Sequence, residues 1–389
     1  MGKSGAIGRI PERPREAQIA SMWDVVIAGA GPAGSVAAHV LARDGRRTLF
    51  VDANQSKHKV GEALPGAALR LLRSLDLPLP DSQGSHCKIG GNFSSWSSEK
   101  LVETDFLLDP DGQGWRLDRL RFDAALRESA IGSGATFKMA RVTEVARQND
   151  LWQLRLDSGE TATARWLVDA TGRSAALARR LGARPTRDTP LVALYAIARP
   201  KAEFRLNRTV VESVSGGWWY AGLLPSGAPL AGFHLRPEDA AILNAKPGAW
   251  HQALMATRHI AALFPNAAFD SPLRALDASG GRINRFFGDG WLACGDAALS
   301  FDPLAAQGIF SALYSGRDAG LAVAAALNDD PAAVDLYSRR LEEVRSIYLL
   351  RCQSIYSSET RWPTAPFWSR FADRGQTENE HQSQTQRTI

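Results

Sequence analysis

The first regular pattern in this chain is a short apolar run, a stretch of small and apolar residues at helical spacing, and a second apolar run. The first run spans 25–28, and the glycine-rich segment after it leads into the helix-like stretch 35–42. The second run spans 48–52 and ends on an acid. Apolar runs of about four to eight residues on either side of a helix are typical of a βαβ unit. The pattern therefore predicts strand, glycine turn, helix and strand in this order.

Later segments predict further strands and helices. The expected strands lie in 89–108, near 142–146 and 152–156, at 166–172 and at 291–296. The expected helices lie at 117–126, from 302 to about 327, and from 332 to 357. Between 191 and 275 the pattern changes to alternating strands with aromatic residues, broken by a helical piece at 249–263. This change predicts a separate β-rich unit inserted into the first one.

The segment 29–34 (GAGPAG) has the glycine spacing of a turn that binds a dinucleotide. Gly29 permits the tight turn, Gly31 allows the backbone to approach a pyrophosphate, and Gly34 allows helix and strand to pack closely. The helix start then offers free N–H groups and the positive end of its dipole to the phosphates. Asp52, roughly 20 residues further on, can accept a hydrogen bond from a ribose hydroxyl. Such glycines alone often mark an ordinary turn, but the strand, helix and acid around them predict a dinucleotide site.

Composition and charge narrow the choice of partners. With 389 residues, of which 44% are hydrophobic, the chain can hold one large domain or two modest ones. The net charge of +5 is spread over scattered basic residues, which favours an anionic cofactor over a nucleic acid. No apolar run reaches the roughly 18 residues of a membrane span, and residues 1–21 lack the apolar core of a secretory signal. The three cysteines are far apart and have no metal-ligand spacing, so we expect no metal site. Their odd number does not suggest a secreted disulfide framework, so we expect a cytoplasmic protein.

Three nucleotide-type turns in order resemble the FAD-dependent aromatic hydroxylase and halogenase superfamily. They are the glycine turn, the segment 169–172 (DATG), and Gly295-Asp296 before a helix start that contains proline. The resemblance covers roughly 24–371. It implies an α/β fold, namely the FAD-binding Rossmann fold of glutathione reductase with an inserted β-rich substrate domain, as in aromatic hydroxylases, and C-terminal helices.

The resemblance also implies domain boundaries. The FAD-binding domain would comprise 23–85, 109–190 and 276–330, and the substrate domain 86–108 and 191–275. A C-terminal helical segment would follow at 331–371. The lead 1–22 and the tail 372–389 are polar and expected to be disordered. Met22 stands directly before the first strand and could be an alternative translation start.

Residues that would hold FAD follow from the same resemblance. The turn around Gly29 would bind the pyrophosphate, Arg119 the phosphate or ribityl region, and Asp296 a ribityl hydroxyl. Val142 would face the adenine edge; an exposed helix arginine and an ordinary core valine are the plain alternatives for Arg119 and Val142. N–H groups near Gln307 would stabilise negative charge on the reduced flavin. The implied FAD-binding residues are Gly29, Ala30, Gly31, Ala33, Gly34, Asp52, Glu62, Ala63, Arg119, Val142, Asp169, Gly172, Gly295, Asp296, Pro303, Gln307, Gly308 and Ile309.

The source of reducing equivalents stays open at this point. No second strand–GxGxxG–helix pattern occurs, because Gly132-Ser133-Gly134 lacks a third glycine and a preceding strand. A separate NADPH domain is therefore not expected. Either NAD(P)H visits the FAD site transiently, or a partner flavin reductase supplies reduced flavin.

Two segments, 61–65 (GEALP) and 302–304 (DPL), resemble the tryptophan-halogenase branch of the superfamily. Lys88 falls where that branch carries its catalytic lysine. The branch signature W-x-W-x-I-P would end at Pro225, but Tyr220 and Gly222 stand in place of its tryptophans. Ala305 stands in place of a glutamate of the branch.

The segments 114–119, 217–220 and 361–368 are more similar to a subgroup that oxygenates a tryptophan within a protein substrate. That subgroup serves the maturation of quinone cofactors such as cysteine tryptophylquinone. The resemblance therefore implies an FAD-dependent monooxygenase that hydroxylates an electron-rich ring through a flavin C4a-hydroperoxide. The ring would be a tryptophan side chain of a protein or peptide substrate.

Three other functions share these FAD motifs: a flavin-dependent tryptophan halogenase, a flavin-dependent isoprenoid reductase, and a non-catalytic flavin-binding assembly factor. Two residues are candidates for catalysis. His234 alternates with apolar neighbours on an expected strand, so it is either a satisfied structural histidine or a proton acceptor beside the substrate ring. Lys88 is either catalytic or a surface lysine beside a turn.

Overall fold

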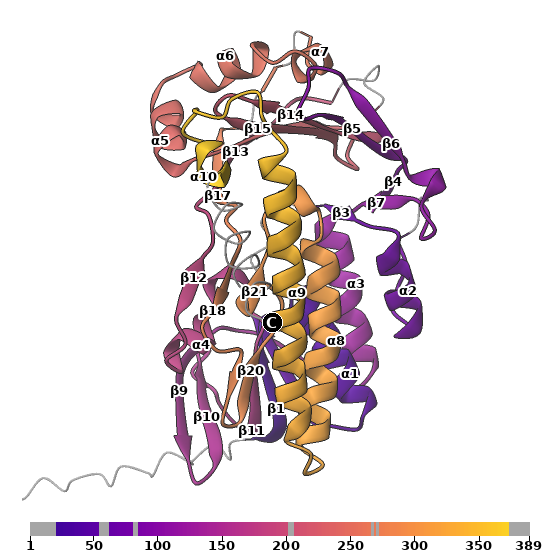
Figure 1. Ribbon diagram of the computed structural model, residues 1–389. Helices are drawn as coiled ribbons and strands as arrows, with labels where there is room; N and C mark the ends of the chain where they lie inside the picture. The colour runs from indigo at the N-terminus through magenta and orange to yellow at the C-terminus, as the bar shows by residue number, and fades with distance from the viewer. Residues whose placement is uncertain are drawn as a thin grey trace, which may run out of the picture.

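The computed structural model describes residues 21–53, 62–80, 85–200, 206–265, 268–269 and 272–372. An eight-stranded sheet forms one half of this structure, and its central strands are parallel (Figure 1). The predicted strand–helix–strand unit is confirmed as β1, α1 and β2. The strand order is β19 (Phe287–Gly288), β20 (Trp291–Ala293), β11 (Thr161–Asp169), β1 (Ser21–Ala28), β2 (Thr48–Asp52) and β8 (Thr136–Met139), with β10 (Leu151–Leu156) and β9 (Val142–Gln148) extending from β11.

Four helices pack together on one side of this sheet (Figure 1). They are α1 (Pro32–Arg43), α3 (Arg119–Gly132), α8 (Gly308–Ala326) and α9 (Ala332–Ser357). Helices α1 and α8 touch through their backbones, because a Cβ on Gly316 would lie 2.3 Å from the carbonyl oxygen of Ala33. Because Ala33 belongs to the first turn of α1 and Gly316 to the middle of α8, the start of α8 extends beyond the start of α1.

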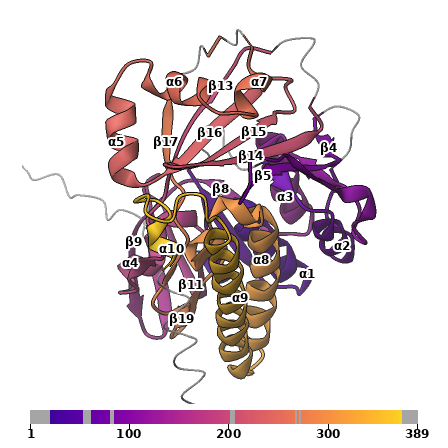
Figure 2. The ribbon, with the colours of Figure 1, turned by 45° about the horizontal axis from the view of Figure 1, so that its top comes forward.

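A seven-stranded sheet forms the other half. Its order is β17 (Arg274–Asp277), β13 (Val192–Ile197), β16 (Pro229–Leu235), β15 (Gly217–Leu223), β14 (Arg208–Val214), β5 (Gly91–Ser95) and β6 (Val102–Asp105). One face is covered by α5 (Pro237–Ala245), α6 (Ala249–Met255) and α7 (Ile260–Leu263) (Figures 1 and 2). Because side chains alternate along a strand, Trp219 packs under these helices while Trp218 points to the other face.

Smaller elements connect the two halves. One short sheet joins β3 (Ala63–Leu64), β7 (Gly114–Arg116) and β4 (Cys87–Ile89), and another joins β12 (Pro185–Arg187), β18 (Gly281–Ile283) and β21 (Leu299–Ser300). Three single-turn helices lie between the halves: η2 (Gly172–Ser174), η3 (Gly295–Ala297) and η4 (Pro303–Ala305). The remaining helices are η1 (Phe106–Leu108), α2 (Ala67–Ser74), α4 (Ala176–Arg180) and α10 (Ser369–Ala372).

The chain after α9 folds back onto the seven-stranded sheet. The carboxylate of Glu359 accepts hydrogen bonds from the Arg361 guanidinium, the Ser213 hydroxyl and the backbone N–H of Ser97. Trp368 adds an Nε1–H bond to the carbonyl of Val214. These bonds tie the segment after α9 to the seven-stranded sheet, while α9 itself packs against α8 in the other half.

Several expected elements differ in detail from those observed. The helix expected from 302 begins only at Gly308, because Ala306 adopts a φ of +49° that breaks it from η4. Helix α5 was not expected between the strands of 191–275, although Pro237 and two acids mark its first turn. Residues 1–20 of the expected lead, nearly all of the expected tail and Gly61 lie outside the described residues. Ser21 and Met22 begin strand β1, so the lead ends two residues earlier than expected. The domain boundaries stay a prediction. None of the described helices is long and apolar enough to cross a membrane.

Candidate active site

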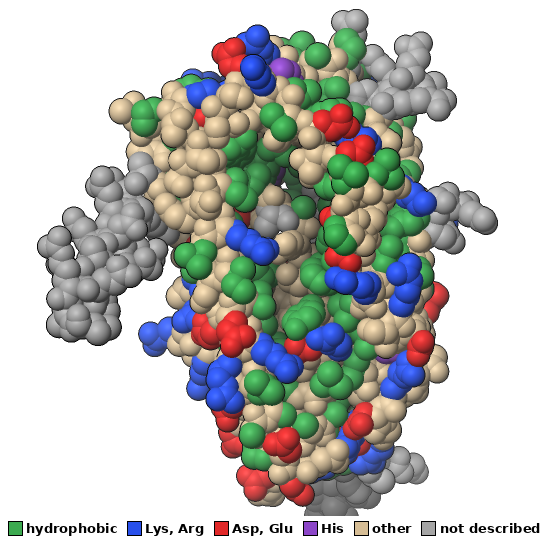
Figure 3. All heavy atoms as spheres, turned by 45° about the vertical axis from the view of Figure 1, so that its right-hand side comes forward, with side chains coloured by type: hydrophobic (Ala, Val, Ile, Leu, Met, Phe, Trp, Pro, Cys, Tyr) green, Lys and Arg blue, Asp and Glu red, His purple; other side chains and the backbone are tan. Residues whose placement is uncertain are grey.

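A large cavity lies between the two halves of the structure. Its volume of about 990 Å³ is at the upper end of the roughly 300–1,000 Å³ typical of ligand pockets. Its floor is formed where β1, β11 and β20 end and where α1 and α8 begin, and its roof by β13, β15 and β16. The carboxyl ends of parallel strands are the usual place for a ligand in α/β folds. Figure 3 shows a hollow between the upper and lower parts of the molecule, with hydrophobic side chains along it.

The glycine turn between β1 and α1 forms one wall. Gly29 has a φ of +106°, and a Cβ there would lie 2.2 Å from the carbonyl oxygen of Ala170, so only glycine fits. A Cβ on Gly34 would lie 1.9 Å from the carbonyl oxygen of Gly29, which explains the close packing of α1 on β1. A Cβ on Gly31, in contrast, would meet no atom within 4 Å. The backbone at Gly31 therefore faces open space at the start of α1.

Two helix N-termini and one acid face the same space. The backbone N–H of Ala30 donates to Asp52 Oδ2 at 2.8 Å, which holds the acid at the end of β2 beside the glycine turn. Helix α8, of 19 residues, begins at Gly308, where an added Cβ would also meet nothing within 4 Å. The first-turn N–H groups and dipoles of α1 and α8 therefore make this cavity favourable for an anionic ligand.

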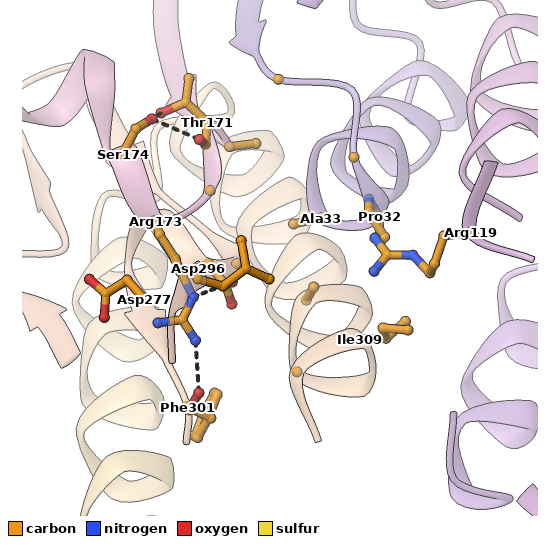
Figure 4. A pocket seen from close by; sticks show the side chains of 18 of the residues that line it. Pro32, Ala33, Arg119, Thr171, Arg173, Ser174, Asp277, Asp296, Phe301 and Ile309 are labelled. Carbon is orange, nitrogen blue, oxygen red and sulfur yellow. Dashed lines mark hydrogen bonds and ion pairs between the residues drawn. The ribbon is translucent and has the colours of Figure 1, made fainter. Parts of the chain in front are cut away.

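Charged side chains lie at opposite sides of the cavity (Figure 4). Arg173 donates to the carbonyl of Phe301 at 2.9 Å, and its Nε lies 3.6 Å from Asp296 Oδ2. Arg119, across the cavity, pairs with Asp123 at 3.1 Å. Burial raises the pKa of Asp296, and the positive charges of Arg173 and Arg119 oppose that rise. These arginines and acids surround a largely apolar centre.

The roof carries aromatic and neutral polar side chains. Tyr195, Tyr220 and His234 project from three neighbouring strands toward the cavity. The His234 ring stacks on Trp218 with centroids 3.6 Å apart, and its buried Nδ1 has no hydrogen-bond partner among the described residues. Burial lowers the pKa of His234 to about 3, so its ring is neutral at pH 7. Arg116, itself buried, donates to the Tyr220 hydroxyl at 3.0 Å.

Comparison with known proteins identifies the family. The family model "Tryptophan halogenase" matches residues 24–109 and 104–388. The chain belongs to the tryptophan halogenase family. It is 30% identical over 360 residues to "Putative FAD-dependent oxidoreductase LodB" of Marinomonas mediterranea, covering 90% of this chain and 96% of that protein.

Solved structures of related proteins share this fold. The structure of the "Peptidyl tryptophan dihydroxylase QhpG essential for tryptophylquinone cofactor biogenesis" is similar with a TM-score of 0.70 and 26% identity, over 90% of this chain and 79% of that one. The flavin-dependent halogenase CmlS has a TM-score of 0.79 at 22% identity, over 93% and 70% of the two chains, and shows the fold alone. The expected α/β fold and the resemblance are confirmed, and this family member is an FAD-dependent monooxygenase-type enzyme.

The cavity residues fit FAD. The open space beside Gly31 and Gly308 lies at two helix N-termini, where a pyrophosphate and the negative end of a reduced flavin are stabilised. Asp52 lies at the end of β2, next to the first of these helix ends, where a ribose would be within reach. When bound, FAD would supply the electrons with which O2 is activated.

Most residues proposed for FAD lie together in the cavity wall. The structure places there Gly29, Gly31, Ala33, Asp52, Glu62, Ala63, Arg119, Val142, Gly172, Gly295, Asp296, Pro303, Gln307, Gly308 and Ile309. Ala30, Gly34 and Asp169 do not line it. The Asp169 carboxylate instead accepts hydrogen bonds from Thr171 and from the backbone N–H of Ala178 at 2.6 Å. It shapes the turn that carries Gly172, and a direct contact of Asp169 with FAD stays a prediction.

The two residues proposed for catalysis lie in different surroundings. His234 lines the roof of the cavity. Lys88 is exposed on β4, with its Nζ 5.7 Å from the centre of the Trp115 ring, and does not line the cavity. The structure does not bring these two candidates together.

Several polar residues of the cavity were not proposed as site residues from the sequence, among them Arg173, Tyr195, Tyr220 and Asp302. Arg173 directly follows the DATG turn, and its position next to a nucleotide-type turn is a signal that could have found it. Tyr220 was noted only as a substitution for a family tryptophan. Nothing in the local sequence distinguishes Tyr195 from other strand tyrosines, because its place in the roof depends on the pairing of β13 with β16.

Proposed function

We propose that this chain hydroxylates an electron-rich aromatic ring, and that the natural ring is a tryptophan side chain within a protein substrate during quinone-cofactor biogenesis. The similarity to QhpG, whose name describes a peptidyl tryptophan dihydroxylase, supports the substrate class. The FAD-dependent chemistry has the broader support of the family and of LodB.

The observation that carries hydroxylation over halogenation is the position of Lys88. A flavin-dependent halogenase passes its oxidised halogen to a lysine near the substrate. Here Lys88 lies on the exposed surface over Trp115, outside the cavity. Tyr220 and Gly222 also stand in place of the tryptophans of the halogenase signature, and the Tyr220 hydroxyl is occupied by Arg116. The position of Lys88 and these two substitutions support hydroxylation over a halogen transfer through Lys88.

The roof residues suit a planar, electron-rich ring. Tyr195, Tyr220 and the neutral His234 line the roof, and a buried aromatic ring prefers stacked or edge contacts with other aromatic rings. The His234 imidazole carries no charge at pH 7 that would need solvation. The protein would thus hold the ring and exclude water, while FAD supplies the oxygen chemistry.

The proposal also covers whether the substrate ring is free or part of a larger molecule, and which donor reduces the flavin. The hollow in Figure 3 supports a substrate that enters as a side chain of a larger molecule. NAD(P)H acting directly, or a separate flavin reductase acting as partner, would reduce the flavin. We propose a cytoplasmic site of action because the sequence has three widely spaced cysteines.

Mass spectrometry after turnover tests the proposal. FAD-loaded enzyme, a reducing system and excess bromide are mixed with free tryptophan and, in parallel, with the unmodified precursor of a tryptophylquinone enzyme. We expect one or two added oxygen atoms on a tryptophan of the precursor and no bromine. Bromine on either substrate refutes hydroxylation, and efficient oxygenation of free tryptophan alone refutes the protein substrate. A variant that cannot bind FAD serves as control for non-enzymatic oxidation.

A further inference from the structure

One carboxylate of the cavity has no part in the proposed binding of FAD. Asp302 lies in the cavity wall just before η4. Its Oδ1 accepts a hydrogen bond from the backbone N–H of Leu304 at 2.8 Å, and its Oδ2 accepts one from the Tyr356 hydroxyl at 2.7 Å. A carboxylate offers about four lone-pair sites. These two bonds therefore fix the carboxylate in place and leave acceptor sites on both oxygens.

Helix α9 contacts Asp302 in two chemically different ways. The Tyr356 hydroxyl donates to the carboxylate, whereas the Tyr348 hydroxyl accepts from the backbone N–H of Asp302 at 2.9 Å. Tyr356 therefore hydrogen-bonds the carboxylate of Asp302, whereas the hydrogen bond of Tyr348 goes to its backbone. Substituting Tyr356 therefore tests the effect on the carboxylate, and substituting Tyr348 provides the matched control.

A hydrogen-bond chain links Asp302 to the roof. The Nε1–H of Trp218 donates to the Tyr356 hydroxyl at 3.0 Å, and the Trp218 ring stacks on His234. The orientation of the Tyr356 hydroxyl is thereby set, because its oxygen accepts from Trp218 and its proton goes to Asp302. The roof that would hold the ring and the carboxylate in the wall are joined by direct contacts.

We propose that Asp302 accepts the proton that the aromatic ring releases. Tyr356 is a positioning residue whose hydrogen bond orients this carboxylate and stabilises its charged form. The inference rests on the proposed hydroxylation. In that reaction one ring carbon gains a C–O bond and loses its C–H bond; the electron pair of the C–H bond stays in the ring and the proton passes to Asp302. The two electrons that reduce the second oxygen atom of O2 to water come from reduced FAD.

Surrounding charges keep Asp302 in a useful range. Burial raises its pKa to about 6, while the bonds from Leu304 and Tyr356 and the positive charges of Arg173 on η2 and Arg370 on α10 lower it. From α9, Tyr348 and Cys352 also face it, and both are neutral at pH 7 because burial raises the pKa of each. A base works best when its pKa is near the working pH. Asp302 meets this condition better than His234, whose pKa is about 3.

The pH dependence of steady-state hydroxylation tests the inference. In the wild type we expect kcat/KM to fall below about pH 6, where Asp302 becomes protonated. Tyr356→Phe removes a hydrogen bond to the charged form, so the fall should move up by about one pH unit. Tyr348→Phe should leave it where it is. Asp302→Asn, which can still accept from Leu304, should lower kcat/KM by about a hundredfold or more and abolish the fall.

Infrared spectroscopy gives a readout that does not need the substrate. The difference between wild type and Asp302→Asn isolates the carboxyl band of Asp302, which we expect to titrate near pH 6 and to move in Tyr356→Phe only. A band that titrates below about pH 4.5, near the ordinary aspartate value, overturns the inference whatever the substrate is. Hydroxylation with the same pH profile in wild type and Tyr356→Phe overturns it as well. If the infrared shift appears as expected but no hydroxylated product forms, the proposed function is refuted, and with it the ring as the source of the proton.

Discussion

Replacing Gly31 by aspartate separates cofactor binding from folding. Gly31 is the N-cap of α1 with φ −76° and ψ −174°, a conformation open to any residue, and its Cβ would meet no atom within 4 Å. Aspartate is also among the preferred N-cap residues, and a negative charge there interacts favourably with the helix dipole. The apo protein should therefore keep its stability or gain up to about 1 kcal/mol.

The same substitution should strongly oppose FAD binding. The new carboxylate would occupy the space proposed for the pyrophosphate. Two like charges about 4 Å apart repel by about 4 kcal/mol at an effective dielectric constant of about 20. We therefore expect the dissociation constant for FAD to rise about a thousandfold. Gly31→Asn, of nearly the same size but without charge, should weaken binding less, and the difference between the two variants measures the electrostatic part.

Two measurements decide this prediction. Quenching of FAD fluorescence gives the dissociation constants of wild type and both variants, and thermal unfolding gives the stability of each apo protein. Saturating FAD should raise the unfolding temperature of the wild type, since a ligand at about a hundred times its dissociation constant adds about 2.7 kcal/mol, and should not raise that of Gly31→Asp. Equal FAD affinity in wild type and Gly31→Asp refutes the placement of the pyrophosphate at this helix end. A large loss of apo stability refutes the reasoning about open space.

Three further outcomes are expected. Gly34→Ala should destabilise the apo protein by about 3 kcal/mol or more, because its Cβ would lie 1.9 Å from the Gly29 carbonyl oxygen; chemical denaturation measures it, and an unchanged midpoint contradicts it. The folded pKa of His234, about 3, is below the unfolded value of 6.5, so at this site the unfolded chain binds more protons and the contribution of His234 to stability falls as the pH drops below about 6.5. By pH 4.5 this contribution has fallen by about 3 kcal/mol, and His234→Phe should remove it, so the difference between the two proteins in unfolding free energy should change across this range. Lys88→Ala should keep FAD binding and change product formation by less than about twofold; a tenfold loss with FAD intact would restore the catalytic role.

The glycine turn and Asp52 could be predicted from the sequence because a βαβ unit is local. Its strand, turn and helix occupy consecutive residues, and each glycine answers a steric need within the same unit, as Gly29 and Gly34 show. The family resemblance extended the prediction of cavity residues to Gln307 and Gly308, which lie at the start of a second helix.

Residues whose place depends on distant pairings could not be predicted. Asp302 and Tyr356 meet only because α9 packs beside α8 and brings its end to the segment before η4, and Tyr195 lies in the roof only through the register of β13 on β16. A sequence motif predicts where Asp169 lies but not what its carboxylate binds. The residue stands at the end of a strand as expected, and its carboxylate accepts hydrogen bonds within the turn that follows. Lys88 shows the same limit, since equivalence in sequence did not place its side chain in the cavity.

The chain order of the cavity wall has a consequence for synthesis on the ribosome. The first helix end comes from Gly31, but β1 pairs with β11, Val25 lying beside Trp166, and the second helix end at Gly308 emerges much later. Domains fold as units when their last essential strand is made, and pairings distant in sequence form slowly. A nascent chain that has not yet reached Gly308 exposes an apolar βαβ unit without its cofactor. We therefore expect slow translation upstream of this point to prolong the exposure of this apolar unit, and flavin supplied during expression to act only on chains that are almost complete.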